Sequence, residues 1–353
     1  MKAAIIGAGA CGLMLGVLFS KNNIDYDIFN KGRPGRKLLA SGNGKCNISN
    51  MYFTLENYHN NPFSYVVKNN QAYLFELFKE LKIYTKSDYE GRLYPISESS
   101  QSVLNIMLNN INKSIIDLEC DDITIDNDKY YINKSYGPYD YVIIATGSSA
   151  AFKVIPSFSF LDKLNLDFEE FKPSLVGFKV KNKIKEISGV RAKCNAALYK
   201  NDVLIHKEAG EVIFKDNGIS GICIMNLSSY YNNLIDKSNT KIELDLLKGC
   251  EYDSYESVLA PKLYNYVINH KINPSSFILN IIDTYEMEFA QVAHGGINYS
   301  EVTSGLMLKK YKNMFAGGEV LNIDGVCGGY NLMFAFSSAI EIFKYIENEI
   351  SNK

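Results

Sequence analysis

The sequence of 353 residues contains no tryptophan, only four histidines and no Cys-x-x-Cys pair. Its seven cysteines are scattered and odd in number, which argues against a disulfide framework, a structural zinc site and a redox-active dithiol. The same pattern favours a reducing compartment, so we expect a cytoplasmic protein. Because the histidines are widely dispersed along the chain, we also expect no metal site.

The chain also lacks a run of about 18 apolar residues, so we expect no transmembrane helix and no membrane partner. The first apolar stretch stops at Gly7, which argues against a signal peptide. The formal net charge is -2, so composition gives no reason to expect a nucleic-acid partner. With 46% hydrophobic residues the chain can bury a large core, and its length favours two or three domains.

The N-terminal segment has the pattern of a strand, a helix and a second strand, over residues 2–6, 10–21 and 25–29. Between the first strand and the helix lies the motif G-x-G-x-x-G, formed by Gly7, Gly9 and Gly12. In this context the first glycine permits a tight turn, the second lets the backbone approach a pyrophosphate, and the third allows close helix–strand packing. The motif therefore predicts a dinucleotide-binding turn.

The second strand ends at Asn30, where dinucleotide-binding domains usually carry an acid that binds the ribose hydroxyls. An amide oxygen accepts one hydrogen bond from a ribose hydroxyl, so the missing bidentate acid does not exclude binding. This departure weakens NAD as the ligand. The cations that follow, at 31, 33, 36 and 37, leave open that the 2′-phosphate of NADP is bound here, or that they form a solvated loop.

Two amphipathic helices are predicted over residues 71–82 and 99–112, followed by a β-meander of 122–126, 130–133 and 139–145. The last of these strands is almost entirely apolar, so we expect it inside the first sheet.

From 174 to 226, short alternating stretches at 176–180, 196–200, 203–206 and 211–214 predict a small antiparallel sheet or barrel. Residues 227–289 are predicted to be mainly helical, with helices at 262–269 and 276–286. The segment 315–346 returns to a strand, a glycine-rich loop and a helix. The predicted fold is an α/β Rossmann-like domain (1–173 and 304–353) with an inserted β domain (174–226 and 287–303) and a helical domain (227–286).

Three features favour FAD as the dinucleotide. Residues 35–47 combine cations, small residues and glycines close behind the second strand. Ala145-Thr146-Gly147 follows an apolar strand, as in many flavoproteins. The segment 315–331 contains two Gly-Gly pairs and the carboxylates Glu319 and Asp324. A carboxylate there suits a ribityl hydroxyl, and the N-terminus of the last helix suits the negative charge of a reduced flavin.

The most specific motifs are GRKLLASGNGKCNISN at 35–50, GRLYPIS at 91–97, NGISG at 217–221, AHGGINYSEV at 293–302 and GGEVLNIDGVCGGYNLMFAFSSA at 317–339. With these motifs the chain resembles the BaiN/YhiN-like flavoprotein family, also described as aminoacetone-oxidase-like FAD enzymes. The resemblance covers nearly the whole chain. It implies a Rossmann-like FAD domain carrying an inserted β domain and a helical domain.

The resemblance implies an FAD-dependent oxidoreductase that transfers a hydride at flavin N5 to or from a small molecule, with O2 or NAD(P)H as the second substrate. The family has been linked to oxidation of an amino ketone and to reduction of unsaturated steroid rings. This sequence departs from the family at Asn30 and Asn322, where an acid is usual, at Ala293, where Thr is usual, and at Ser148, where Gly is usual.

Three other functions remain open: an NADP-dependent reductase, an FAD-dependent RNA-modifying enzyme and a non-catalytic redox-sensing flavoprotein. His294, beside two glycines, is the weak candidate for acid–base catalysis, although a structural role is more typical of such a position. For Cys46 a lowered pKa and simple packing beside the cofactor are the two interpretations. The predicted cofactor-binding residues are Gly7, Gly9, Ala10, Cys11, Gly12, Asn30, Lys31, Arg36, Lys37, Leu38, Ser41, Gly42, Asn43, Gly44, Cys46, Asn47, Ala145, Thr146, Gly147, Gly318, Glu319, Asp324, Gly328, Gly329, Tyr330 and Asn331.

Overall fold

The computed structural model describes residues 1–152 and 158–351. The chain divides into two compact units. The first comprises Met1–Ser149, Val154–Phe171 and Gly295–Lys353, and the second comprises Ala150–Lys153 and Lys172–His294.

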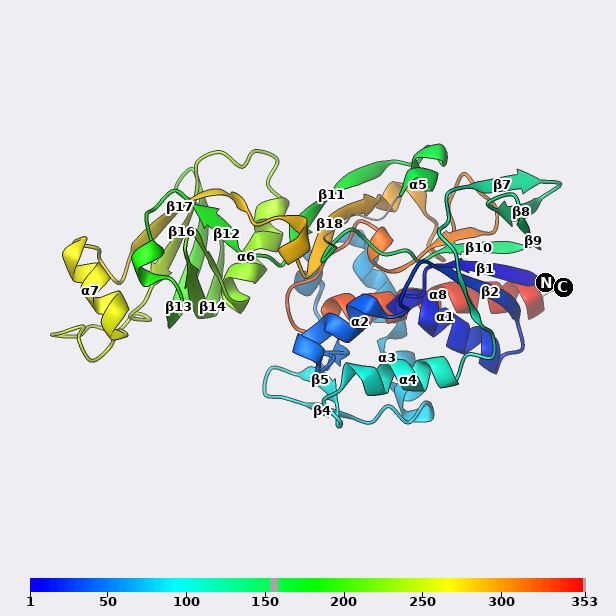
Figure 1. Ribbon diagram of the computed structural model, residues 1–353, viewed down its shortest axis with the longest axis horizontal. Coiled ribbons are helices and arrows are strands. Elements are labelled where there is room, and N and C mark those ends of the chain that lie inside the picture. The colour runs from blue at the N-terminus through cyan, green and yellow to red at the C-terminus, as the bar shows by residue number, and fades with distance from the viewer. Residues whose placement is uncertain (153–157, 352–353) are drawn as a thin grey trace. The chain divides into compact units, whose positions relative to one another are not determined.

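The first unit is built on a five-stranded parallel sheet in the order β19-β10-β1-β2-β6 (Figure 1). Strand β1 is buried along nearly all of its length, as expected for the centre of a parallel sheet. The strand order reverses at β1, so the carboxyl ends of β1 and its neighbours form the crevice where this fold binds ligands. The strands are β1 (Lys2–Ile6), β2 (Asp25–Asn30), β6 (Ile115–Asp117), β10 (Tyr141–Ile144) and β19 (Met314–Ala316).

Helices of the first unit pack against this sheet and one another, and α8 contacts both α1 and α3 (Figure 1). The helix predicted at 10–21 is confirmed. The helix predicted at 71–82 begins earlier, because Val66 and Val67 continue its buried face. The helices are α1 (Ala10–Lys21), α2 (Arg36–Ala40), α3 (Tyr65–Glu80), α4 (Ser100–Asn109), α5 (Ser159–Lys163) and α8 (Tyr330–Ser351).

Two three-stranded antiparallel sheets complete this unit. One has the order β3-β5-β4, and the other is the predicted meander, β7-β8-β9. The strand predicted at 139–145 is divided at Asp140: β9 stays in the meander and β10 enters the parallel sheet, while the Asp140 carboxylate accepts the Lys2 N–H at 2.6 Å. The strands are β3 (Ser49–Asn50), β4 (Thr85–Ser87), β5 (Arg92–Pro95), β7 (Ile123–Asp126), β8 (Lys129–Ile132) and β9 (Tyr136–Tyr139).

The second unit contains a closed antiparallel barrel in the order β12-β15-β14-β13-β16-β17, which confirms the predicted barrel. Its core includes Phe178, Leu198, Val212 and Leu279, with Leu227 of α6 packed into the same cluster. A separate pair of strands, β11 (Phe168–Ser174) and β18 (Val292–Ile297), forms a two-stranded sheet. The barrel strands are β12 (Phe178–Val180), β13 (Arg191–Lys200), β14 (Val203–Lys215), β15 (Gly218–Ser220), β16 (Thr240–Asp245) and β17 (Phe277–Thr284), and the helices are α6 (Ile222–Asn232) and α7 (Pro261–Asn269).

The sequence-based prediction is wrong in the region 227–286, which does not form a helical domain. Strands β16 and β17 from this region close the barrel, and the helix predicted at 276–286 is strand β17. Phe277, Leu279 and Ile281 point inward with exposed residues between them, which is the period of a strand. The Asn273-Pro274-Ser275 segment forms a turn into that strand. The strands predicted at 203–206 and 211–214 are one continuous strand, β14.

Candidate functional site

The glycine turn between β1 and α1 has the geometry that a dinucleotide requires. Gly7 has φ +107°, and a Cβ there would lie 2.4 Å from Ala145 O. A Cβ on Gly12 would lie 1.9 Å from Gly7 O, so both positions exclude a side chain for reasons of packing alone. A Cβ on Gly9, in contrast, would meet nothing within 4 Å. The space beside Gly9 is therefore open to a ligand.

Gly9 is also the N-cap of α1, and no side chain caps that end of the helix. The first turn of α1 contains no acidic residue. Backbone N–H groups and the helix dipole at such an end favour a bound anion. The open space and the uncapped helix together fit the pyrophosphate of a dinucleotide.

Asn30, at the end of β2, holds the turn in place. Its Oδ1 accepts the Ala8 N–H at 2.9 Å, and its Nδ2 donates to the carbonyls of Lys31 and Gly32 at 3.2 and 3.0 Å. The Gly35 N–H donates in turn to Ala8 O at 2.8 Å. An amide supplies both the acceptor and the donors in this arrangement, whereas a carboxylate would face two carbonyl oxygens. Asn30 is thus a fixed part of the turn.

Lys37 joins three segments that are distant in sequence. From α2 its Nζ donates to Glu319 Oε2 at 2.6 Å and to Ser148 Oγ at 2.8 Å. Burial lowers the pKa of Lys37, and the attraction of Glu319 opposes that shift. The carboxylate of Glu319, which the sequence suggests for a ribityl hydroxyl, is engaged by this lysine. The ion pair fixes the loop after β2 against the segments that follow β10 and β19.

The rest of the loop at 41–47 is folded by its own backbone. Gly42, Asn43 and Gly44 all have positive φ values of 53° to 86°. Cys46 is fully buried, and burial raises the pKa of its thiol to about 11. The interpretation of Cys46 as an activated thiol is therefore wrong, because its side chain is desolvated.

The C-terminal glycine segment is anchored to the same loop. Gly329 has φ +93°, and a Cβ there would lie 2.3 Å from Ser49 O. Asn50 Nδ2 donates to Gly328 O at 2.9 Å. With its amide oriented to suit both neighbours, Asn47 donates to Ser49 O and accepts the Gly329 N–H at 3.0 Å. These contacts set the position at which α8 begins.

Tyr330 and Asn331, predicted to contact the cofactor, also hold this segment. Tyr58 Oη donates to Tyr330 O at 2.7 Å, and the two rings pack edge to face. The Asn331 amide accepts the Gly325 N–H and donates to Gly325 O, both at 2.9 Å. Asp324, also predicted to contact the cofactor, is buried. Their contacts to a cofactor stay a prediction.

The first unit thus brings together the glycine turn, Asn30, the loop at 35–47, the end of β10 and the segments around Glu319 and Gly329. His294 is buried in β18 and belongs to the second unit, so its role in catalysis stays a prediction. No cluster of His, Cys, Asp or Glu suited to a metal ion occurs among the described residues.

Sequence reasoning missed two positions that the structure connects. Ser148, noted only as a departure from the family, accepts a hydrogen bond from Lys37. Asn322 accepts the Gly295 N–H at 3.1 Å and donates to Glu169 Oε2 at 3.1 Å. An aspartate at 322 would place two carboxylates in contact, so the amide here is matched to Glu169. Only a paired comparison of positions 169 and 322 could have revealed this from sequence.

Within residues 1–152 and 158–351, no helix has the length and apolarity needed to cross a membrane. Residues 1–344 match the family model described as the HI0933-like protein Rossmann domain.

A 3-dehydro-bile acid delta(4,6)-reductase of Clostridium scindens is 25% identical, with 96% of this chain and 97% of that protein aligned. A ribosomal RNA dihydrouridine synthase of Escherichia coli is 22% identical, with 96% of each chain aligned. Among solved structures, a 3-ketosteroid-delta4-(5alpha)-dehydrogenase from Rhodococcus jostii has a similar fold, with a TM-score of 0.51, 9% identity, and 97% of this chain and 96% of that chain covered. The chain belongs to the HI0933-like Rossmann family, that of the BaiN/YhiN-type FAD-dependent oxidoreductases, as its motifs predict.

Proposed function

We propose that this protein reduces a carbon–carbon double bond conjugated to a carbonyl group in a small molecule, by hydride transfer at flavin N5. The observation that carries this proposal is the chemistry common to the two kinds of curated relatives. A 3-dehydro delta(4,6) steroid and a uracil ring both contain such a bond, and both names denote its saturation. Each relative aligns with nearly the full length of this chain.

The residues of the first unit fit FAD. Bound FAD would supply a hydride at N5 of its ring system. The open side of Gly9 and the uncapped N-terminus of α1 would hold the pyrophosphate. The backbone at Gly328 and Gly329, at the start of α8, would face the flavin and favour negative charge on it. The Lys37–Glu319 pair would keep these two ends of the site in register.

The electron donor in this proposal is NADH or NADPH, bound transiently. The sequence contains one dinucleotide turn, and FAD would occupy it. The nicotinamide donor would therefore have to bind and leave without a Rossmann domain of its own.

The test begins with purified protein whose bound flavin is released and identified by chromatography. The flavin is then photoreduced without oxygen and mixed in a stopped-flow instrument with a 3-oxo-delta4 steroid or with the corresponding saturated ketone. We expect reoxidation by the unsaturated compound alone. Equal rates with both compounds, or reoxidation by O2 only, would contradict a reductase of conjugated double bonds. A colourless protein that binds NADP would instead support the NADP-dependent alternative.

The second candidate is reduction of a uracil ring within RNA, favoured by the ribosomal RNA dihydrouridine synthases among the relatives. Mixing the same photoreduced protein with ribosomal RNA and assaying dihydrouridine distinguishes this candidate from the reduction of a small molecule. Flavin that no donor reduces and no acceptor reoxidises would favour a non-catalytic redox sensor.

A further inference from the structure

A hollow on the outer wall of the barrel contains a motif that the nucleotide site does not use. Gly218, in the NGISG motif, lies in β15 directly between Lys179 of β12 and Lys215 of β14. A Cβ on Gly218 would lie 2.5 Å from Tyr285 Oη and 2.1 Å from Phe178 O. The missing side chain therefore lets Tyr285 lie against the strand, with one lysine on each side.

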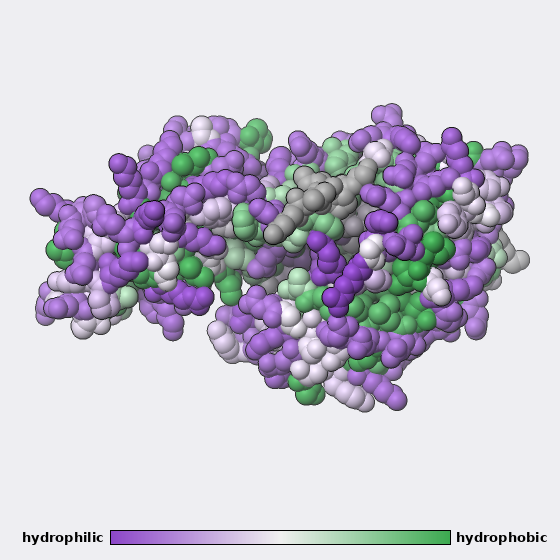
Figure 2. Space-filling model, viewed as in Figure 1, coloured by the Kyte–Doolittle hydropathy of each residue, from purple (hydrophilic) through white to green (hydrophobic). Residues whose placement is uncertain are grey.

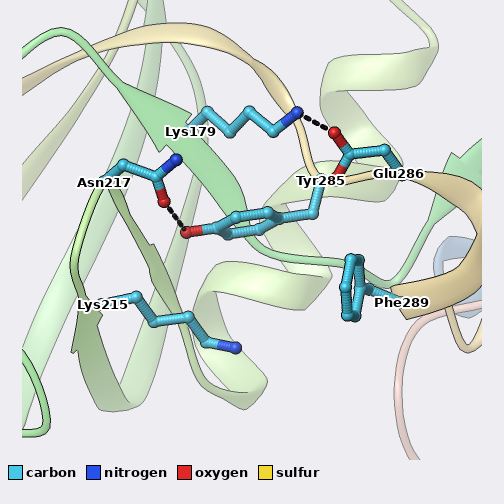
Figure 3. Close-up of a pocket in the computed structure, with 6 residues that line it drawn as sticks. All are labelled: Lys179, Lys215, Asn217, Tyr285, Glu286 and Phe289. Carbon is cyan, nitrogen blue, oxygen red and sulfur yellow. Dashed lines mark hydrogen bonds and ion pairs between the residues drawn. The ribbon is translucent and has the colours of Figure 1, made fainter.

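Tyr285 is held in this position by the same motif. Its hydroxyl donates to Asn217 Oδ1 at 2.9 Å (Figure 3). The Nζ atoms of Lys179 and Lys215 lie 5.9 and 5.5 Å from the centre of its ring. Figure 3 shows these lysines on either side of the ring, with Phe289 on the side of Lys215. The result is a preformed pocket of lysine and aromatic groups.

The charges in this pocket are unequal. Lys179 is paired with Glu286, while no ion pair of the described residues involves Lys215. Asp216, the neighbouring acid, is hydrogen-bonded to Ser188. Phe289 is 60% exposed, so its ring is accessible to a ligand. The pocket thus presents one lysine outside the ion pairs of the described residues and one accessible aromatic ring.

Cations continue along the chain from this pocket. Residues 179–193 contain six lysine or arginine residues and one acid. Lys181, Lys183 and Lys185 are all exposed and take part in no ion pair of the described residues. The part of the molecule that contains the barrel strands is covered mainly by hydrophilic residues on the face shown in Figure 2. Residues 283–289, which contribute Tyr285 and Phe289 to the pocket, contain three acids and no cation, so the excess of cations is confined to the 179–193 segment.

We propose that this pocket binds a nucleotide unit, with its phosphate on Lys215 and its base stacked on Phe289. The cavity has a volume of about 280 Å³, just below the roughly 300–1,000 Å³ of typical small-molecule sites, so we match it to a single nucleotide unit and not to a whole FAD or NADP. The nucleotide comes either as a free nucleoside monophosphate or as one unit of single-stranded RNA. This site is separate from the flavin site in its residues and goes beyond the proposed reaction.

The test measures binding of UMP and of a 12-residue single-stranded oligouridylate to the full chain, by calorimetry and fluorescence anisotropy. Phe289→Ala should weaken binding about tenfold, and Phe289→Tyr should preserve it. Lys215→Ala should reduce the slope of log K against log salt for the oligonucleotide by about 0.7. The matched control is Lys241→Ala, because Lys241 also lies over a tyrosine on this barrel, 5.6 Å from the Tyr199 ring, but is paired with Asp202.

Binding of UMP that is weakened by the pocket variants and not by the control supports a site for free nucleotides. Binding of the oligonucleotide alone, with the same pattern, supports an RNA site. The proposal is overturned if neither probe binds, or if Phe289→Ala and Lys215→Ala bind like the wild type. Flavin content is recorded for each variant and should not change. Failure of the flavin proposal would therefore leave the nucleotide-binding result interpretable. Failure of the nucleotide-binding test would likewise leave the flavin proposal unaffected.

Discussion

Gly9 differs from the other two glycines of the turn in what surrounds it. Its φ of -81° suits any residue, and a Cβ would meet no atom within 4 Å. Gly9→Val should therefore lower the free energy of unfolding of the apoprotein by no more than about 1 kcal/mol, the cost of a poorer N-cap residue. The added side chain fills the space proposed for the pyrophosphate, so flavin content should fall at least about tenfold. Absorbance near 450 nm and chemical denaturation measure the two effects.

Gly12→Val is the contrasting variant, because its Cβ would lie 1.9 Å from Gly7 O. It should lose both fold and flavin. Full flavin content in Gly9→Val would show that the pyrophosphate binds elsewhere, whereas unfolding of Gly9→Val would show that the open space is not present in solution.

Asn30 allows a second prediction at this scale. Asn30→Ala removes the acceptor of the Ala8 N–H, at a cost of about 1–2 kcal/mol in the free energy of unfolding. The loosened turn should weaken FAD about tenfold and leave FMN, which lacks the adenosine half, unchanged. Kd values from flavin fluorescence quenching test this difference.

Asn22→Ala is the control for Asn30→Ala, since Asn22 makes a similar hydrogen bond, to Leu18 O, at the opposite end of α1. It should leave both flavin affinities unchanged. Equal weakening of FAD and FMN by Asn30→Ala would mean that Asn30 does not act through the dinucleotide turn.

At the scale of secondary-structure elements, Glu98 connects the loop at 35–47 to the region of the β3-β5-β4 sheet. Hydrogen bonds from Lys86 and Lys45, at 2.6 and 2.9 Å, lower the pKa of Glu98 from 4.5 to about 2. A depressed carboxyl pKa stabilises the folded state above pH 4.5, and this contribution is lost as the pH falls from 4.5 toward 2. Glu98→Gln should therefore lower the urea midpoint at pH 7 and narrow its difference from the wild type as the pH falls below 4.5.

Circular dichroism at pH 7, 4.5 and 3.5 follows this change without tryptophan fluorescence, which the protein lacks. Glu76→Gln is the control, because Glu76 pairs with Lys79 inside α3 and connects no two elements. A constant difference between Glu98→Gln and the wild type at all three pH values would exclude the proposed ion-pair contribution.

Strand β17 offers a test of an element whose type the sequence mispredicts. Leu279 is fully buried in the barrel, while Ile282 on the same strand is 57% exposed. Leu279→Ala should lower the free energy of unfolding by about 2–5 kcal/mol, and Ile282→Ala by less than about 0.5 kcal/mol. Similar losses in both variants, by urea denaturation, would contradict the inward and outward alternation of β17.

The accuracy of the sequence-based predictions depended on how local the determining contacts are. Strand β1, helix α1 and the glycine turn follow from residues within 30 positions, and the structure matches their predicted ranges. Strand β17 does not follow from nearby residues, since it pairs with β12, about a hundred residues earlier, and with β16. Its short alternation FILNIIDT was outweighed by the Asn-Pro-Ser turn before it, which also precedes many helices.

The same distinction applies to the candidate site. The glycines were identifiable because their motif is contiguous. The contacts of Lys37 with Ser148 and Glu319 span 111 and 282 positions, and no local pattern encodes them. Likewise, the side chain of Asn30 could be named from its place in the motif, but its bond to the Ala8 N–H required the folded turn. The sequence thus identified the candidate residues, and the folded structure showed which of them contact one another.

At the scale of the whole molecule, each unit has its own core, and every residue that we assign to FAD lies in the first unit. Ligand binding stabilises only the part of a protein that contains the site, by RT ln(1 + [L]/Kd). FAD at about 100 times its Kd should therefore add about 2.7 kcal/mol to the unfolding of the first unit and nothing to the barrel. Calorimetry of the apoprotein should show two transitions, of which FAD raises one. Hydrogen exchange of the backbone amides in β1 and β13 assigns each transition to its unit. Gly9→Val should abolish the shift that FAD causes. An equal shift of both transitions would instead mean that the two units unfold as one.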